Sequence, residues 1–130
     1  MATQLGTGAE GFIGNELSRT LVAAGHEVVS TMLGDGAPHD LPPQVRIVSC
    51  DVTDAKAVRD VVATVAPATI YHLAAQSNPV LSWAKPTETI RTNVLGTVHL
   101  LDAVVVAGLS SRVFIAASSA EYGYTARPGH

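Results

Sequence analysis

Three glycines at a three-residue spacing near the N-terminus constrain this chain most. Gly8, Gly11 and Gly14 stand in residues 7–14, which read TGAEGFIG. A short apolar segment precedes them and a helical pattern follows, so the chain must turn sharply from strand to helix. Glycines at such a turn let the backbone approach an anion, which the free N–H groups of the helix start can hold. The spacing predicts a phosphate-binding turn, although spaced glycines also occur in ordinary loops.

The composition indicates one globular domain. The 130 residues are 47% hydrophobic and 15% charged, with a net charge of −3, which gives no basic footprint for nucleic acid or an anionic membrane. Cys50 is the only cysteine, which excludes an internal disulfide and a Cys-based zinc cluster. No apolar run reaches the length of about 18 residues that a membrane span needs, and no signal sequence opens the chain. We therefore expect a cytoplasmic protein without metal, membrane or nucleic-acid partners.

Apolar spacing along the chain predicts alternating strands and helices. The expected strands span residues 3–7, 26–32, 45–49, 69–73 and 112–117. The expected helices run from residue 12 to Gly25, from Thr53 or Asp54 to Pro67, and from 86 to 107. Residues 34–43 are dense in turn formers, so one crossover is expected to be a loop. This alternation predicts an α/β, Rossmann-like, doubly wound parallel sheet with strand order 3-2-1-4-5 and helices on both faces.

Two of these elements carry informative side chains. The first strand contains Gln4 and Gly6, which are unusual in a central parallel strand, so we expect weak support for the glycine turn. The apolar positions of the last helix recur at helical spacing and comprise Ile90, Val94, Val98, Leu101 and Val105.

Four segments fall at the predicted carboxyl ends of strands: the glycine stretch, Asp51, residues 74–77 and Ser118. Ligands of open parallel sheets bind outside these ends, where the strand order reverses. Together the four segments therefore indicate a dinucleotide site more strongly than the glycines alone.

Five motifs, in this order, resemble the extended short-chain dehydrogenase/reductase family, the NAD-dependent epimerases, dehydratases and reductases of nucleotide sugars. The matching pieces are TGAEGFIG (7–14), CDVTD (50–54), HLAAQS (72–77), TNVLGT (92–97) and SSAEYG (118–123). They cover nearly the whole chain. The combination is most similar to GDP-4-keto-6-deoxy-D-mannose reductases, with nucleotide-sugar 4-epimerases next.

The resemblance implies a set of cofactor-binding residues. The phosphate loop would comprise Gly8, Gly11, Phe12, Ile13 and Gly14, and Asp51 and Val52 would contact the adenine. The loop along the ribose and pyrophosphate would comprise Leu73, Ala74, Ala75 and Gln76. Asn93 would be the helix residue that braces the site. As alternatives, Asp51 is also found as a turn or cap acid, and Asn93 as an exposed polar helix residue. His72 is expected to be a packed, hydrogen-bonded histidine, and Cys50 a small buried residue rather than a nucleophile.

The resemblance also implies a substrate site for a nucleotide sugar. Ser118 matches the catalytic Ser/Thr that hydrogen-bonds the reacting oxygen of the sugar, and Gln76 and Ser119 match substrate contacts. The two serines are also typical of residues that solvate a strand end. Dehydratase members carry a Glu where Ala120 stands, so a 4,6-dehydratase is disfavoured, though it stays an alternative beside a UDP-hexose 4-epimerase.

The family's catalytic Tyr-x-x-x-Lys pair has no match here, because Lys56 and Lys85 are the only lysines and neither follows a tyrosine by four. We therefore expect residues 1–130 to be the NAD(P)-binding domain of a longer enzyme, inactive alone and homodimeric at full length. A non-catalytic NADP-binding regulatory module is the rival from another class.

The end of the second strand bears on the choice of cofactor. Residues 30–33 read STML, with neither the acid that bonds the ribose 2′-hydroxyl of NAD nor the Arg that meets a 2′-phosphate. The missing acid favours NADP, and NAD stays open.

Overall fold

The computed structural model describes residues 2–34, 40–75 and 79–117. Five strands form one parallel sheet: β1 (Thr3–Thr7), β2 (Glu27–Met32), β3 (Arg46–Ser49), β4 (Thr69–His72) and β5 (Arg112–Ile115). Their order is β3-β2-β1-β4-β5. The helical elements are α1 (Phe12–Ala23), α2 (Ala55–Val65), α3 (Pro79–Ala84), α4 (Pro86–Ile90), the π-helical η1 (Arg91–Leu95) and α5 (Gly96–Val106). The predicted fold class and strand order are confirmed.

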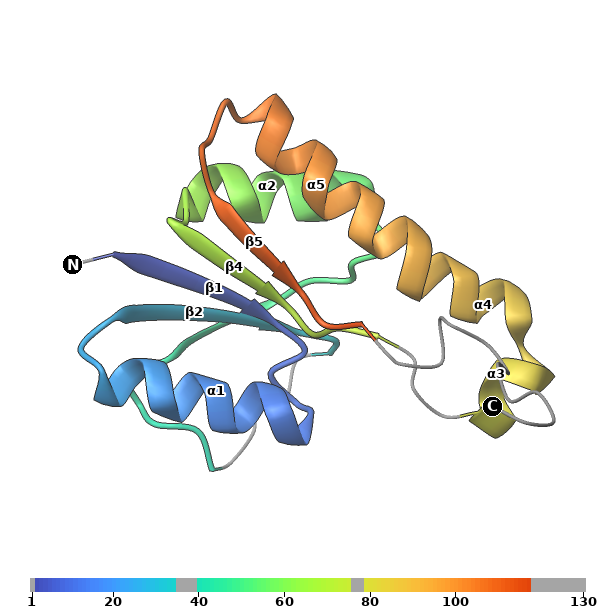
Figure 1. Ribbon diagram of the computed structural model, residues 1–130, viewed down its shortest axis with the longest axis horizontal. Coiled ribbons are helices and arrows are strands. Elements are labelled where there is room, and N and C mark those ends of the chain that lie inside the picture. Colours follow the sequence, from blue (N-terminus) through green and yellow to red (C-terminus); the bar gives the residue numbers. More distant parts are fainter. Residues whose placement is uncertain (1, 35–39, 76–78, 118–130) are drawn as a thin grey trace, which may run out of the picture.

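Helices cover both faces of the sheet, as Figure 1 shows. On one face, α2 and α5 pack against each other and over the larger core cluster, which includes Leu5, Ile70 and Leu100. On the other face, α1 lies over a smaller cluster of Leu21, Val28 and Val45. Successive residues of a strand point to opposite faces, which is why Val28 and Val29 belong to different clusters.

The polar first strand lies at the centre of the sheet. β1 pairs with β2 on one side and with β4 on the other. Gln4 is only 5% exposed there, and a Cβ at Gly6 would lie at ordinary contact distance, 3.5 Å, from Ser30 Oγ. Ser30 Oγ itself lies 3.1 Å from Ser18 Oγ of α1. The two buried hydroxyls thus pair with each other across the contact between β2 and α1. Because neither is left unsatisfied, their burial costs little stability.

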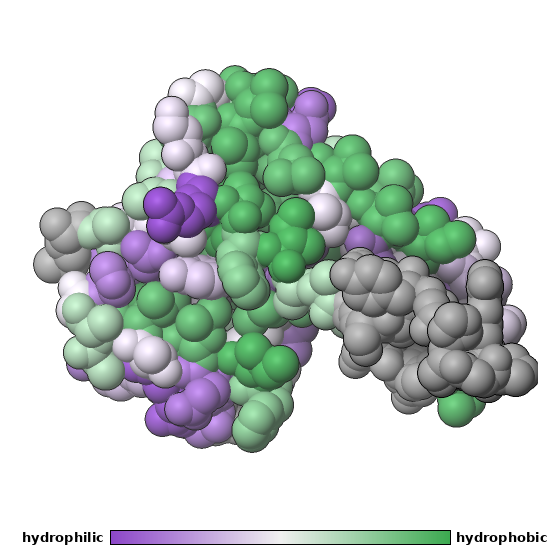
Figure 2. Space-filling view, viewed as in Figure 1, coloured by the Kyte–Doolittle hydropathy of each residue, from purple (hydrophilic) through white to green (hydrophobic). Residues whose placement is uncertain are grey.

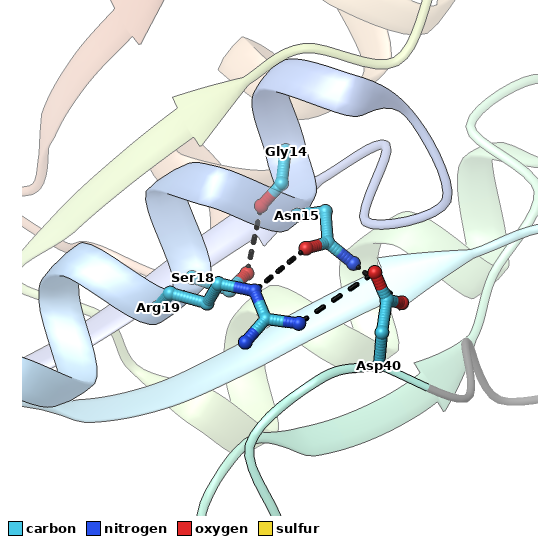
Figure 3. Close-up of polar contacts among 5 residues, drawn as sticks. All are labelled: Gly14, Asn15, Ser18, Arg19 and Asp40. Atoms are coloured by element: carbon cyan, nitrogen blue, oxygen red, sulfur yellow. Dashed lines mark hydrogen bonds and ion pairs between the residues drawn. The ribbon is translucent and has the colours of Figure 1, made fainter.

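The crossover from β2 to β3 has no helix in its described part, residues 33–34 and 40–45, as expected. Asp40 of this crossover binds α1: Asn15 Nδ2 donates to its Oδ1 at 2.9 Å, and Arg19 Nη2 lies 3.5 Å from its Oδ2. Arg19 Nε also donates to Asn15 Oδ1 at 3.0 Å, and Figure 3 shows the three side chains converging. This cluster fixes the loop beside the helix, although each exposed pair contributes little by itself.

The second helix begins at a side-chain cap. Of the two candidates, Asp54 is the cap, because its Oδ1 accepts the N–H of Ala57 at 3.1 Å. The helix ends at Ala66, whose φ of 46° is left-handed, directly before Pro67. The predicted start and stop signals of this helix are confirmed.

The predicted helix 86–107 is present as three successive segments, α4, η1 and α5. The π-helical turn η1 was not predicted, nor was the short helix α3 before it. The apolar positions used to predict the helix are exposed, whereas Leu100, Ala103 and Val104 face the core. Because apolar residues lie around most of the circumference of α5, periodicity identified the helix but could not tell which face is buried.

An apolar flank, defined here as Val94, Val98, Leu101, Val105 and Ile115, remains exposed. Figure 2 shows apolar residues gathered over β5 and along α5. β5 is the last strand of the described sheet on this side. None of the helices in the described ranges has the length and apolarity of a membrane span.

Candidate functional site

The glycine turn is held by close backbone contacts on two sides. Gly8 has a φ of +80°, and a Cβ there would lie 3.0 Å from the backbone of Leu73 and Ala74. A Cβ at Gly14 would lie 2.1 Å from the carbonyl oxygen of Gly8. The N–H groups of Gly8 and Ala9 both donate to Thr31 O at 3.2 Å. The turn therefore packs so tightly against α1 and the loop after β4 that only glycine fits at these positions.

The first turn of α1 opens onto a cleft. The first N–H groups of an α-helix have no intrahelical partner, and Gly11 at the N-cap supplies no side-chain acceptor for them. Their partial positive charge is therefore available to a ligand. Phe12 and Ile13 are 89% and 66% exposed, large fractions for apolar side chains. The arrangement offers both hydrogen-bond donors for an anion and an apolar surface beside them.

The cleft has a volume of about 700 Å³, within the range of small-molecule sites. Nine of the predicted cofactor residues line it: Gly8, Gly11, Phe12, Ile13, Gly14, Leu73, Ala74, Ala75 and Asn93. His72 and Thr97 also line it, together with Ile115, Ala116 and Ala117 at the end of β5. The glycine turn, the loop after β4 and η1 thus meet at the carboxyl ends of the central strands, where open parallel sheets bind ligands.

A smaller pocket of about 80 Å³ adjoins this cleft, since Gly8, Ala74 and Ala75 line both. It contains two of the other three predicted residues, Asp51 and Val52; the third, Gln76, lies outside the described residues. Its wall is completed by Thr31, Met32, Leu33, Cys50, Thr92 and Glu10. The two cavities follow the edge of the sheet from η1 to the end of β2, an elongated shape that suits an extended ligand.

Asp51 takes part in a turn and also lines the smaller pocket. Its Oδ1 accepts the N–H and the hydroxyl of Thr53, at 2.9 and 2.7 Å. The turn-acid interpretation is therefore confirmed by geometry. Its Oδ2 makes no hydrogen bond within the described residues, and an exposed carboxylate oxygen on a pocket wall can accept a bond from a ligand.

Two side chains of reactive type, His72 and Cys50, are buried and held neutral. His72 is hydrogen-bonded at both ring nitrogens, to Thr7 and Thr97, and its burial lowers the pKa of the ring. Burial raises the pKa of the Cys50 thiol, and the nearby charges of Asp51 and Asp54 raise it further. A thiol with a raised pKa is a poor nucleophile at neutral pH. Both residues match their expected structural roles.

Three predicted substrate residues, Gln76, Ser118 and Ser119, lie outside the described residues, as does the position of Ala120. The predictions for them stand as made. Conversely, Thr7, Glu10 and Thr97 line or support the cavities and were not singled out from the sequence. Each lies inside or beside a motif already quoted, so its place in TGAEGFIG or TNVLGT was the available signal.

Comparison with known proteins extends these observations. A family model described as GDP-mannose 4,6 dehydratase matches residues 5–129. The chain is 30% identical over 133 residues to GDP-mannose 4,6 dehydratase 2 of Caenorhabditis elegans, covering 90% of this chain and 35% of that protein. It is 35% identical over 123 residues to UDP-glucose 4-epimerase of Mycolicibacterium smegmatis, covering 90% of this chain and 39% of that protein.

Solved structures with a similar fold include enzymes of the same kind. The crystal structure of UDP-glucose 4-epimerase from Brucella ovis in complex with NAD matches with a TM-score of 0.85 at 27% identity, over 98% of this chain and 39% of that chain. The chain thus spans well under half the length of each of these proteins. By its sequence and its fold, the chain belongs to the GDP-mannose 4,6 dehydratase family, nucleotide-sugar epimerases and dehydratases of the extended short-chain dehydrogenase/reductase type.

Proposed function

We propose that the cleft binds NADP, with NAD as the alternative, and that the chain is the cofactor-binding part of a nucleotide-sugar oxidoreductase. The main support for this proposal is that eleven of the predicted cofactor residues line two adjoining cavities. The free N–H groups at the start of α1 suit a pyrophosphate. At the other end of the elongated space, Asp51 Oδ2 is placed to accept a hydrogen bond from an adenine amine.

The favoured reaction is the reduction of a GDP-4-keto-6-deoxy sugar at C4. A bound nicotinamide dinucleotide supplies hydride in such chemistry. In this proposal, Ser118 orients the C4 oxygen, Gln76 and Ser119 contact the sugar, and Phe12 and Ile13 exclude water. A tyrosine beyond residue 130 exchanges the proton, so residues 1–130 alone are expected to be inactive. The protein acts in the cytoplasm in this account.

Two other reactions of the same family are supported by relatives. The Mycolicibacterium smegmatis relative is a UDP-glucose 4-epimerase, and the matching family model describes a dehydratase. The Ala at position 120 argues against the dehydratase, since that reaction needs a carboxylate base there. A non-catalytic NADP-binding regulator would keep the cleft and lack turnover.

The reaction test uses the full-length protein. Mixing it with NADPH and a GDP-4-keto-6-deoxy hexose is expected to consume NADPH, measured by its absorbance. Epimerisation of a UDP-hexose without net NADPH consumption would instead identify the epimerase. Dinucleotide binding with no turnover of either substrate would favour the regulatory module.

Glu10 provides a test of the cofactor choice. It lines the smaller pocket with Thr31 and Leu33, at the end of β2, where the ribose 2′-group of a dinucleotide lies. Its carboxylate should repel a 2′-phosphate, so Glu10→Gln is expected to tighten NADP binding about five-fold, as for a charge interaction of ~1 kcal/mol. NAD binding should not change. Isothermal titration calorimetry measures both, with Glu16→Gln of α1 as the control.

The opposite result would reverse the assignment. If Glu10→Gln weakens NAD binding and leaves NADP unchanged, Glu10 is the acid that bonds the 2′-hydroxyl, and the cofactor is NAD. Because both ligands are measured on one variant, a general loss of folding cannot imitate either outcome.

We also propose that the full-length protein is a homodimer and that the apolar flank takes part in the contact. Val98 is exposed at the middle of the flank, so Val98→Asp should place a charge in the interface and shift the protein towards monomer. Ala63→Asp on the exposed face of α2 is the matched control. Light scattering after gel filtration measures the mass. A dimer unaffected by Val98→Asp would place the contact elsewhere.

A further inference from the structure

One buried histidine joins two sides of the cleft. His72 is 4% exposed at the end of β4. Its Nδ1 lies 2.8 Å from Thr7 Oγ1, and its Nε2 lies 3.1 Å from Thr97 Oγ1. Thr7 is the last residue of β1, directly before the glycine turn, whereas Thr97 is the second residue of α5. The ring therefore links the centre of the sheet to the helix across the cleft.

The proton on the Thr7 hydroxyl can be placed by counting donors. Thr7 Oγ1 accepts the backbone N–H groups of Leu73 and Ala74, both at 3.0 Å. A hydroxyl oxygen has two lone pairs and one proton. With both lone pairs used, the proton points to His72 Nδ1, which must be unprotonated to accept it.

The orientation of the remaining bonds follows from this. A neutral ring that accepts at Nδ1 carries its proton on Nε2, which then donates to Thr97 Oγ1. The Thr97 hydroxyl in turn donates to the carbonyl of Asn93, at 3.1 Å. Asn93 lies in η1, the π-helical turn that lines the cleft. All bonds thus run one way, from the loop amides to η1.

We propose that His72, in its neutral Nε2–H form, is a positioning residue that aligns the loop after β4 with η1 on the opposite side of the cleft. Its ring is not hydrogen-bonded to either end of the relay and acts through Thr7 and Thr97. Its effect on ligand binding rests on the proposed function, whereas its tautomer and its effect on the loop do not. We call the five bonds from the Leu73 and Ala74 amides to the Asn93 carbonyl the His72 relay.

Acid is expected to break the His72 relay. A second ring proton would lie on Nδ1 and face a hydroxyl whose lone pairs are already used. Among the described residues of β1, β4, η1 and α5, only the hydroxyls of Thr7 and Thr97 lie within hydrogen-bond distance of the ring, and no charged group does. Nothing there stabilises a charged imidazolium.

The direction of the pH effect follows from linkage. Burial lowers the pKa of His72 in the folded protein below 6.5, while an unfolded histidine titrates near that value. The unfolded state therefore binds more protons as the pH falls below about 6.5. The stabilisation is complete above that pH and is lost progressively below it.

The first experiment determines the tautomer without any cofactor. Long-range ¹H–¹⁵N spectra of the uniformly labelled protein distinguish Nε2–H, Nδ1–H and doubly protonated histidines. We expect His72 in the Nε2–H form at neutral pH, staying neutral as the pH falls through 6.5. An Nδ1–H ring, or a doubly protonated ring above pH 6.5, would overturn the proposal.

The second experiment tests whether the relay holds the loop. Thr97→Val keeps the shape of the side chain and removes both hydrogen bonds, whereas Thr97→Ser keeps the hydroxyl. We expect hydrogen exchange of the Leu73 and Ala74 amides to be about five-fold faster in Thr97→Val, the effect of one net hydrogen bond, and Thr97→Ser to restore it. Equal exchange in the two variants would contradict the positioning role.

The third experiment measures binding of NADPH against pH, with His26→Gln as the control histidine variant. The 2′-phosphate of NADPH itself titrates at about pH 6 and contributes equally in all variants. Once the pH is low enough to protonate His72, below 6.5, the dissociation constant should rise several-fold more in the unaltered protein than in His72→Gln, which should bind more weakly at neutral pH. An equal pH dependence in the unaltered protein and in His72→Gln would overturn the inference. If NADPH does not bind at all, the proposed function fails, while the tautomer and exchange results still decide the role of His72.

Discussion

Gly14→Ala is expected to lower the melting temperature of the domain by about 10 °C, corresponding to about 3 kcal/mol. The added Cβ would lie 2.1 Å from the carbonyl oxygen of Gly8, and both the carbonyl and the helix are backbone that cannot rotate away. Alanine favours a helix by up to about 1 kcal/mol over glycine, so a loss of stability would show that the close contact dominates. Thermal unfolding followed by circular dichroism measures it.

Gly6→Ala is the matched control for Gly14→Ala. A Cβ at Gly6 would lie 3.5 Å from Ser30 Oγ, an ordinary contact. Alanine also orders a strand better than glycine by about 0.5–1 kcal/mol, so this variant should be as stable as the parent or slightly more so. Equal loss in both variants would mean that the turn does not depend on the contact between Gly8 and Gly14.

Ile70→Ala is expected to destabilise the domain by about 3–4 kcal/mol. Ile70 is 0% exposed in β4, between β1 and β5, and belongs to the core beneath α2 and α5. Removing its side chain leaves a cavity that two sheet neighbours and two helices cannot easily fill. Since small domains are stable by only about 5–15 kcal/mol, the loss should be clear in urea unfolding.

Ile13→Ala makes the same chemical change at an exposed position of α1. Its free energy of unfolding should stay within about 0.5 kcal/mol of the parent. A comparable loss at both positions would contradict the assignment of Ile70 to a packed core.

Much of the fold was predictable from the sequence because its signals were local. The glycine turn, the cap at Asp54 and the polar crossover are each specified by residues that lie next to each other, and all three are confirmed. The strand order followed from the general rules for parallel sheets. Gln4 did not prevent a central strand, because its neighbours on both sides supply the pairing.

The features that the sequence did not predict depend on contacts between distant residues. The apolar positions around Val98 predicted the helix but not its buried face, because apolar residues lie around most of the helix. The π-helical turn at Asn93 has no distinctive residue that would have indicated it in the sequence. Pairing of His72 with Thr7, 65 residues away, needs the sheet to form first. Asp51 was predicted as a turn acid or a ligand contact, and it lies where both roles are compatible.

The most direct test of the central claim is a calorimetric titration of NADPH and NADP⁺ into the protein and into Gly11→Ala. A Cβ at Gly11 meets only Gly8 O, at 3.4 Å, and the residue lines the cleft, so the variant should keep its melting temperature. We expect binding at one site in the parent and at least about ten-fold weaker binding in Gly11→Ala, a loss of about 1.4 kcal/mol. The account would be contradicted if the folded parent bound none of NADPH, NADP⁺ and NAD. It would also be contradicted if Gly11→Ala bound the dinucleotide as tightly as the parent.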